Sequence, residues 1–285
     1  MAVLDAQCVQ DFIQCAHNGW LQGWHERNGG NLSYRMKAEE AAELQGAFDE
    51  SGEWTPLGVT AENLANEYFL VTGTNRYFQN IKQKPAENIG ICKLNADGSA
   101  YKVVWGLTVG HKPTSEFATH VMNHSVRVKA TNGTSRVISH AHPTDVIALT
   151  FILENSAKAW SQALWQAMTE CVVIFPQGVG VIEWMVCGGP DIARASAQEM
   201  EKYAALIWAQ HGLFCAGDDF DSTFGMMHAI VKAAEILIKV FSSGKPVLQS
   251  IEPEGLRDIA KAFNLPLDES LLEDWDSLAL PLLPF

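Results

Sequence analysis

The chain has 285 residues, of which 47% are hydrophobic and 19% charged, and its formal net charge is −13. Its basic residues form no run or stripe, so we expect neither a nucleic-acid groove nor an anionic membrane as partner. The six cysteines show no C-x-x-C spacing, no Lys or Arg precedes Arg27, and no apolar run reaches membrane-spanning length. These features predict a globular cytoplasmic protein with reduced thiols.

Helices and strands are predicted to alternate along the whole chain. Helical spacing of apolar residues, or a helix-start signal, predicts helices at residues 9–24, 114–126, 144 onward, 190 onward and 220–241. Apolar or alternating runs predict strands at residues 32–36, 68–71, 89–94, 100–105, 136–140, 171–175, 179–182 and 206–215. The turn at residues 95–98 should join two of these strands as a hairpin.

The mixture of hairpins and crossovers predicts an α/β fold without an internal linker. We expect a single domain over residues 1–285, with a mixed, mostly antiparallel central sheet and helices on both faces. Residues 37–66, rich in Glu, Gly and Asn, are expected to form a surface insertion, and residues 266–285 an irregular tail.

Histidines at the end of one predicted strand indicate a metal site. His140 and His142 are two residues apart and therefore point to the same face of an extended strand. His211 lies in a second apolar run, and three neutral imidazoles around zinc leave the fourth position open, as in catalytic sites. The alternatives are buried histidines satisfied by hydrogen bonds, or a metal site at His120 and His124, one helical turn apart but without an evident third ligand.

Glu116 is the candidate general acid/base. It lies at the start of a predicted helix, where the helix dipole favours a carboxylate even without a functional role. Beside a catalytic zinc ion, however, a carboxylate is the usual group that moves the proton.

Three short segments are candidates for anion binding. Residues 28–31, 72–74 and 114–115 combine glycines, hydroxyls or amides with free backbone N–H groups at element ends, although each also suits an ordinary turn or cap. No phosphate-binding P-loop motif occurs. Gly178 and Gly180 begin a dinucleotide-binding fingerprint, but Glu183 occupies the third glycine position, so nicotinamide chemistry is not expected.

Taken in order, these segments resemble the class II sugar-phosphate aldolases of the class II aldolase and adducin-like family, over nearly the whole chain. The resemblance is carried by residues 24–32, 71–74, 113–116, 140–142, 169–171 and 211–212, together with Trp165. Residues 37–66 and those beyond about 265 match poorly, and Thr74 and Asn75 stand where serine and glycine are typical.

The resemblance implies a role for each candidate residue. Zinc, one ion per subunit, would be held by His140, His142 and His211. Glu116 would be the catalytic acid/base, and Glu170 a second catalytic residue contributed by a neighbouring subunit of a C4 homotetramer. The phosphate end of the substrate would contact Asn28, Gly30, Asn31, Gly73, Thr74, Thr114 and Ser115.

The resemblance also implies a reaction, the reversible cleavage of L-rhamnulose 1-phosphate to dihydroxyacetone phosphate and L-lactaldehyde. Other sugar-phosphate aldolases and the pentulose-phosphate 4-epimerases are alternatives, because they share the zinc site and the retro-aldol step. A non-catalytic adducin-like scaffold is the remaining alternative, which the presence of all three histidines disfavours.

Overall fold

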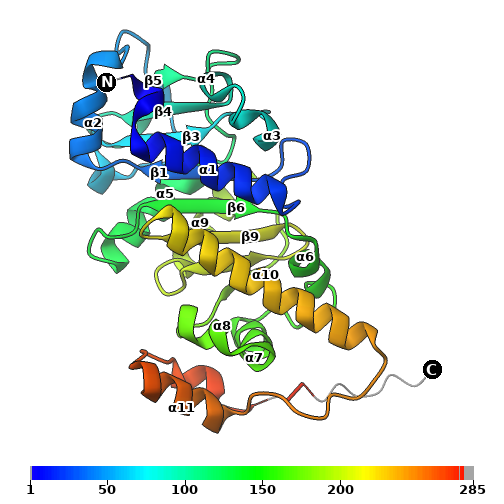
Figure 1. Ribbon diagram of the computed structural model, residues 1–285. Helices are drawn as coiled ribbons and strands as arrows, with labels where there is room; N and C mark the ends of the chain where they lie inside the picture. Colours follow the sequence, from blue (N-terminus) through cyan, green and yellow to red (C-terminus); the bar gives the residue numbers. More distant parts are fainter. Residues whose placement is uncertain (1, 276, 279–285) are drawn as a thin grey trace.

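The computed structural model describes residues 2–275 and 277–278, and one sheet runs through the molecule (Figure 1). Its nine strands have the order β2-β5-β4-β3-β1-β6-β9-β8-β7. Every neighbouring pair is antiparallel except β7 and β8, which are parallel. The predicted mixed, mostly antiparallel sheet is therefore confirmed.

The strands other than β2, and helices α1, α5, α6, α9 and α10, lie close to predicted segments, whereas α2, α3, α4, α7, α8 and α11 were not predicted. The strands are β1 Asn31–Arg35, β2 Thr55–Pro56, β3 Tyr68–Thr72, β4 Ile89–Leu94, β5 Ala100–Gly106, β6 Val137–Ala141, β7 Gly180–Ile182, β8 Ala205–Trp208 and β9 Gly212–Gly217. The helices are α1 Gln7–Leu21, α2 Ala38–Leu44, α3 Phe78–Ile81, α4 Pro85–Asn88, α5 Phe117–Ala130, α6 Thr144–Leu149, α7 Ala157–Ala167, α8 Thr169–Ile174, α9 Pro190–Glu199, α10 Phe220–Ser242 and α11 Pro253–Phe263. Short 3-10 turns occupy Val3–Asp5, Gln45–Ala47, Glu62–Leu64 and Glu269–Leu272.

Helices cover both faces of the sheet, as predicted (Figure 1). Helices α1 and α10 cover one face, where Phe12 and Phe220 pack in one cluster with Val137 of β6. Helices α5 and α9 cover the other face, where Ile192 packs in a cluster with Ile138. Side chains alternate along a strand, so His140 lies on the same side as Ile138. The sheet thereby directs this histidine toward the α5 face.

Two predicted strands are wrong. Residues 171–174 lie in helix α8, in which Cys171 and Val172 are buried while Ile174 is exposed, and Phe175 follows the end of the helix. A short apolar run does not distinguish a strand from a buried helical turn, and one-sided burial decides for the helix here. Residues 206–215 form two strands, β8 and β9, joined by a turn in which Gln210 has a φ of 53°. His211 therefore lies in a turn rather than within a strand.

The two segments outside the family resemblance have more structure than expected. Residues 37–66 are mostly exposed, but they contain α2 and the edge strand β2, and they bury Leu44, Leu57 and Leu64. The expected irregular tail begins with the 3-10 turn Glu269–Leu272, whose leucines pack against the core. Residues 276 and 279–285 of that tail lie outside the described residues.

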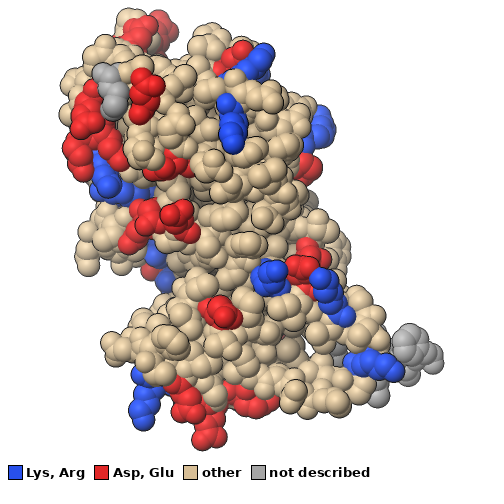
Figure 2. Space-filling view, viewed as in Figure 1, with Lys and Arg blue, Asp and Glu red and all other residues tan. Residues whose placement is uncertain are grey.

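The visible surface carries charges of both signs. On the face seen in Figure 2, acidic and basic side chains are scattered among uncharged ones. None of the helices in the described part of the chain is long and apolar enough to cross a membrane.

Candidate metal centre and acid–base site

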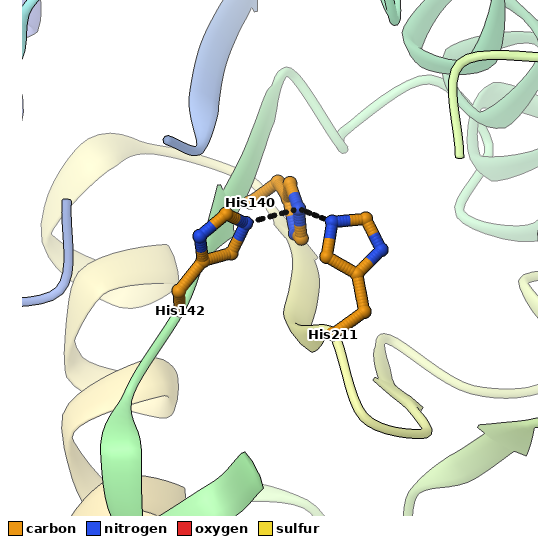
Figure 3. A group of neighbouring side chains, drawn as sticks. All are labelled: His140, His142 and His211. Carbon is orange, nitrogen blue, oxygen red and sulfur yellow. Dashed lines mark hydrogen bonds between the residues drawn. The ribbon is translucent and has the colours of Figure 1, made fainter. Parts of the chain in front are cut away.

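Three histidines from separate stretches of the chain converge on one point (Figure 3). His140 lies in β6, His142 just beyond its end, and His211 in the turn before β9. The Nε2 atom of His140 lies 3.2 Å from the Nε2 atom of His142 and 3.2 Å from that of His211. Nitrogen ligands of a tetrahedral zinc ion, each about 2.05 Å from the metal, are separated by about 3.3 Å. The spacing therefore fits a single metal ion.

Hydrogen bonds orient two of these imidazoles for metal binding. His140 Nδ1 lies 3.0 Å from the carbonyl oxygen of Leu213, which can only accept, so Nδ1 carries the proton and Nε2 is free. His142 Nδ1 lies 2.7 Å from a carboxylate oxygen of Glu26, and the same reasoning leaves its Nε2 free. A second hydrogen bond of this kind fixes the ring orientation and basicity of metal-ligating histidines.

Burial keeps two of the imidazoles, those of His140 and His211, uncharged. The pKa of His140 lies well below its usual value because of burial, reinforced by His142 and His211. Burial, with repulsion from His142, lowers the pKa of His211 to about 4. Neutral imidazole is the form that binds a metal, so these two histidines do not have to lose protons first at neutral pH.

A buried carboxylate stands beside this cluster. Glu116, the residue that precedes α5, places Oε2 4.0 Å from Nε2 of His140 and is only 6% exposed. Burial raises the pKa of Glu116, and a hydrogen bond from Asn31 opposes that rise. A carboxyl group with a raised pKa exchanges protons more readily near neutral pH, as a general acid/base requires.

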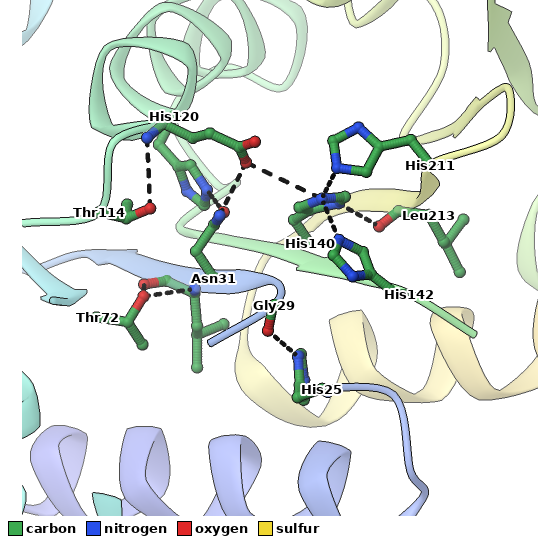
Figure 4. A network of polar contacts seen from close by, with 12 residues as sticks. His25, Gly29, Asn31, Thr72, Thr114, His120, His140, His142, His211 and Leu213 are labelled. Atoms are coloured by element: carbon green, nitrogen blue, oxygen red, sulfur yellow. Dashed lines mark hydrogen bonds and ion pairs between the residues drawn. The ribbon is translucent and has the colours of Figure 1, made fainter. Parts of the chain in front are cut away.

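Asn31 connects Glu116 to a buried polar chain (Figure 4). Its Nδ2 donates to Glu116 Oε2 at 2.8 Å, while its Oδ1 accepts a hydrogen bond from His120 Nε2. The hydroxyl of Ser33 lies 2.6 Å from His120 Nδ1 and 2.8 Å from His124 Nε2. With His120 Nε2 donating, Nδ1 accepts from Ser33, whose oxygen then accepts from His124. These two histidines thus form a structural network, and they do not join the metal cluster.

Two of the predicted anion-binding segments lie side by side next to Glu116. Thr114 N donates to Thr72 O at 2.8 Å, and Thr74 N donates to Lys112 O at 3.1 Å. The hydroxyl of Thr114 accepts from the backbone N–H of Glu116 at 3.3 Å, and Ser115 is exposed. The third segment reaches the site through Asn31, whereas Asn28 is exposed.

Gly30 allows the third segment to approach β6. It has a φ of 72°, and a Cβ atom there would lie 2.5 Å from the carbonyl oxygen of His140 and 2.5 Å from Nδ1 of His25. His25 itself is held by stacking on Phe78, with ring centroids 3.7 Å apart. No side chain larger than hydrogen fits at this position without displacing the strand that carries His140 or the ring of His25.

Glu170 stands apart from the cluster within the chain. It lies in the first turn of α8 and is exposed. The neighbouring Cys171 and Val172 pack in the same cluster as α10 residues, on the sheet face opposite Glu116. The structure of one chain therefore does not bring Glu170 to the histidines.

Sequence reasoning missed two residues near the site. Arg76 donates from Nε to the carbonyl oxygen of Thr74 at 3.2 Å, which puts a cation beside a predicted anion-binding segment. The Sγ atom of Cys187, a carboxylate oxygen of Glu116 and a ring nitrogen of His211 all lie within 4.8 Å of one another. Both residues lie in loops, where neither periodicity nor spacing to the other site residues identifies them.

Comparison with known proteins assigns the family. Residues 10–238 match the class II aldolase and adducin N-terminal domain, and the chain belongs to this family. Rhamnulose-1-phosphate aldolases of Shigella sonnei and Escherichia coli K12 are each 43% identical over 264 residues, covering 92% of this chain and 96% of theirs.

Solved structures share the fold. A sugar-phosphate aldolase from Thermotoga maritima, 24% identical, superposes with a TM-score of 0.68 over 85% of this chain and 97% of its own. An L-fuculose-1-phosphate aldolase from Thermus thermophilus, 17% identical, gives a TM-score of 0.56 over 85% of this chain and 100% of its own. These likenesses confirm the class II aldolase fold.

Proposed function

We propose that this chain is a metal-dependent lyase that cleaves L-rhamnulose 1-phosphate reversibly to dihydroxyacetone phosphate and L-lactaldehyde. The 43% identity to rhamnulose-1-phosphate aldolases over 92% of the chain carries this conclusion. The cluster of His140, His142 and His211 with Glu116 beside it is the constellation that such a reaction needs. The same cluster argues against a non-catalytic scaffold.

His140, His142 and His211 are the proposed ligands of one zinc ion per subunit. The family is metal-dependent, and the 3.2 Å separations of the Nε2 atoms suit a tetrahedral ion with one open position. When bound, zinc would supply the Lewis acidity that polarises the ketose carbonyl and offsets the negative charge that develops on cleavage.

Glu116 is the proposed proton carrier at C3. In the cleavage direction its carboxyl group protonates C3 of the dihydroxyacetone phosphate part, and in the condensation direction its carboxylate removes that proton. Asn31 was expected to contact phosphate, but both ends of its amide are engaged by Glu116 and His120. We assign Asn31 to orienting Glu116.

The phosphate end of the substrate is proposed to lie over the paired loops. The hydroxyls of Thr74, Thr114 and Ser115 are the donors proposed there, because the backbone N–H groups of Gly73, Thr74 and Thr114 already donate to carbonyl oxygens of the chain. Arg76 adds a guanidinium group beside Thr74, and in the part of the chain that the structure describes no carboxylate forms an ion pair with it. The proposed contacts are Asn28, Gly30, Gly73, Thr74, Arg76, Thr114 and Ser115.

Assembly into a C4 homotetramer in the cytoplasm completes the proposal. Glu170 lies exposed on α8, away from the histidines of its own chain. A catalytic role for this carboxylate therefore requires that it reach the site of a neighbouring subunit.

One assay series tests this function. Purified protein should cleave L-rhamnulose 1-phosphate, lose that activity to a chelator and regain it with zinc. Non-phosphorylated L-rhamnulose should give a much lower kcat/KM, because remote phosphate contacts help position the reacting end. Ser115→Ala and Arg76→Ala should reduce kcat/KM for the phosphorylated ketose alone. Equal values for both ketoses would exclude the phosphate site, and full activity in His211→Ala would exclude the metal site.

A further inference from the structure

A cavity of about 360 Å³ lies beside α2, at the far end of strands β1 and β6 from the three histidines. Strand β1 begins at Asn31, which bonds Glu116, and ends at Arg35, which lines the cavity. Arg136 also lines the cavity and directly precedes β6, whereas His140 lies near the other end of that strand. At about 3.3 Å per residue, roughly 13 Å of strand separates Arg35 from Asn31. The cavity is therefore distinct from the metal centre and from the proposed phosphate site.

Basic side chains outnumber acidic ones around this cavity. Among the described residues, the charged members of its lining are Arg35, Lys37, Arg136 and Glu67. Three cations and one carboxylate give the lining a net charge of +2. Glu67 pairs with Arg35 at 3.1 Å, and no carboxylate in the described part of the chain forms an ion pair with Lys37 or Arg136. This local excess of positive charge stands in a chain whose net charge is −13, so the cavity attracts an anion.

Arg35 is the buried anchor of this group, with only 6% of its surface exposed. Its Nη1 bonds Glu67, and its Nη2 donates to two backbone carbonyl oxygens, at 2.7 and 3.3 Å. Its Nε has no hydrogen-bond partner among the described residues, and a buried donor without an acceptor is destabilising. Burial lowers the pKa of the nearby His124, and repulsion from Arg35 and Arg136 adds to this effect. The acidic groups around the two arginines therefore leave part of their positive charge uncompensated.

We propose that this cavity binds the phosphate group of a small phosphorylated sugar or polyol, at a second site separate from the metal centre. A phosphate monoester carries a charge of about −1.5 to −2 at neutral pH, which matches the +2 of the lining. A monocarboxylate would compensate only half of that charge. Arginine offers several N–H donors to phosphate oxygens, and lysine adds a compact positive charge. The volume of about 360 Å³ lies within the range of small-molecule sites.

The remaining walls suit the sugar or polyol part of such a ligand. Helix α2 lines the cavity with Ala38, Ala41 and Ala42, whose small side chains leave the space open. Gln45 and Asn66 also line it, and within the described part of the chain neither side-chain amide forms a hydrogen bond with another residue. An amide both donates and accepts, as the hydroxyls of a sugar or polyol require. The cations would hold the phosphate group, and the amides would hold the hydroxyls.

Isothermal titration calorimetry of chelator-treated protein with glycerol 3-phosphate tests this site. Lys37→Gln should weaken binding in the cavity roughly 10-fold or more, the loss expected for one charge-assisted hydrogen bond. Lys37 is exposed and its ammonium group forms no ion pair among the described residues, so this variant should fold as the parent does. Lys129→Gln is the matched control, because it removes an exposed lysine of α5 outside the cavity. It should bind as the parent does.

Two arginine variants separate the cavity from the phosphate site of the proposed function. Arg136→Gln should lose binding in the cavity, whereas Arg76→Ala should keep it. Arg136 also donates to two backbone carbonyl oxygens, at 3.3 and 3.4 Å, so circular dichroism checks that this variant is folded. Absence of a binding site that depends on Arg76 would contradict the phosphate site of the proposed function alone.

The ligand class is tested with the same titration. Glycerol should not bind, and inorganic phosphate should bind more weakly than glycerol 3-phosphate, because it lacks the hydroxyls that the amides would contact. Equal affinity for the two phosphates would overturn the sugar or polyol part of the proposal. Parental affinity in both Lys37→Gln and Arg136→Gln would overturn the site itself, as would equal weakening in Lys129→Gln, which would mean that binding follows net charge alone.

Discussion

Glu116 Oε2 lies 4.0 Å from Nε2 of His140, so the proposed proton carrier stands next to a proposed metal ligand. Glu116→Gln keeps the shape of the side chain and removes its ability to carry a proton. We expect folding and zinc content to be preserved while kcat for cleavage falls by about 10²–10⁴-fold. Steady-state kinetics with metal analysis of the same preparation check this.

Proton exchange at C3 of dihydroxyacetone phosphate in deuterated water isolates the step assigned to Glu116. The Gln variant should lose exchange together with cleavage. If it exchanges at the parental rate yet fails to cleave, Glu116 is not the base at C3, and Glu170 becomes the candidate to test next.

The amide of Asn31 sets how readily Glu116 ionises. Its hydrogen bond lowers the pKa of Glu116 against the effect of burial, so Asn31→Ala should raise that pKa further. Exchange at C3 needs the ionised carboxylate. The low-pH limb of the plot of exchange rate against pH should therefore move to higher pH in the variant. Thr114→Val is the matched control for the position of this limb, since the Thr114 side chain hydrogen-bonds Glu116 only at its backbone N–H and not at its carboxylate. A limb that stays in place in Asn31→Ala contradicts this role.

At the scale of elements, the loop after α1 is shaped by its contact with β6. Gly30 and Gly23 have similar positive φ angles, 72° and 75°, but only Gly30 would bring a Cβ atom against other groups. Both alanine variants incur the cost of the left-handed conformation, about 1–2 kcal/mol. Gly30→Ala should lose about 1–3 kcal/mol more, because the added methyl group overpacks the strand contact.

Urea unfolding of the two glycine variants measures that difference, and zinc titration gives a second readout. Gly30→Ala should also bind zinc more weakly, since the strand that it displaces carries His140. Gly23→Ala should bind zinc as the parent does. Equal free energies of unfolding for the two variants would mean that the loop moves away from β6 without a loss of stability.

The sequence predicted elements well where a clear hydrophobic pattern or turn signal identified them. Helix α10, strand β6 and the hairpin of β4 and β5 were all expected close to their observed bounds. Residues 171–175 were mistaken for a strand because five apolar residues satisfy either period, and only tertiary packing selects the helix.

The candidate site was predictable in part, for a different reason. His140 and His142 share a strand, so spacing alone placed them together. Asn31 and Glu116 are 85 residues apart, and their hydrogen bond depends on the pairing of β1 with β3, because Thr114 N donates to Thr72 O at the end of β3. Arg76 and Cys187 lie in loops, whose course follows from packing rather than from local pattern.

At the scale of the whole molecule, buried neutral histidines should make the free energy of unfolding depend on pH. Burial lowers the pKa of His25 and of His120 to about 3, against about 6.5 in an unfolded chain. Between these pH values the unfolded chain binds protons that the native state does not bind. The free energy of unfolding therefore decreases as the pH is lowered. The stabilisation is complete above pH 6.5 and decreases by about 1.4 kcal/mol per pH unit for each histidine below it.

Urea unfolding of the chelator-treated protein at intervals from pH 7 to pH 5 measures this slope, above the range where most carboxylates titrate. His120→Asn removes one of the titrating groups. It should reduce the slope of the free energy of unfolding against pH by the contribution of one histidine. A free energy of unfolding that is constant over this range contradicts the neutral state of these histidines.

The order of strands in the sheet divides the chemistry along the chain. Strands β1 to β5 lie on one side of β6, and this side supplies Asn31, in β1, and Glu116, in the connection from β5 to α5. The three histidines come from β6, the residues just after it and the turn between β8 and β9. A backbone break at the exposed Asn132, between α5 and β6, would leave the proton carrier on one fragment and every imidazole of the cluster on the other. Neither fragment alone would hold both functions, so catalysis belongs to the junction between the two halves rather than to either half.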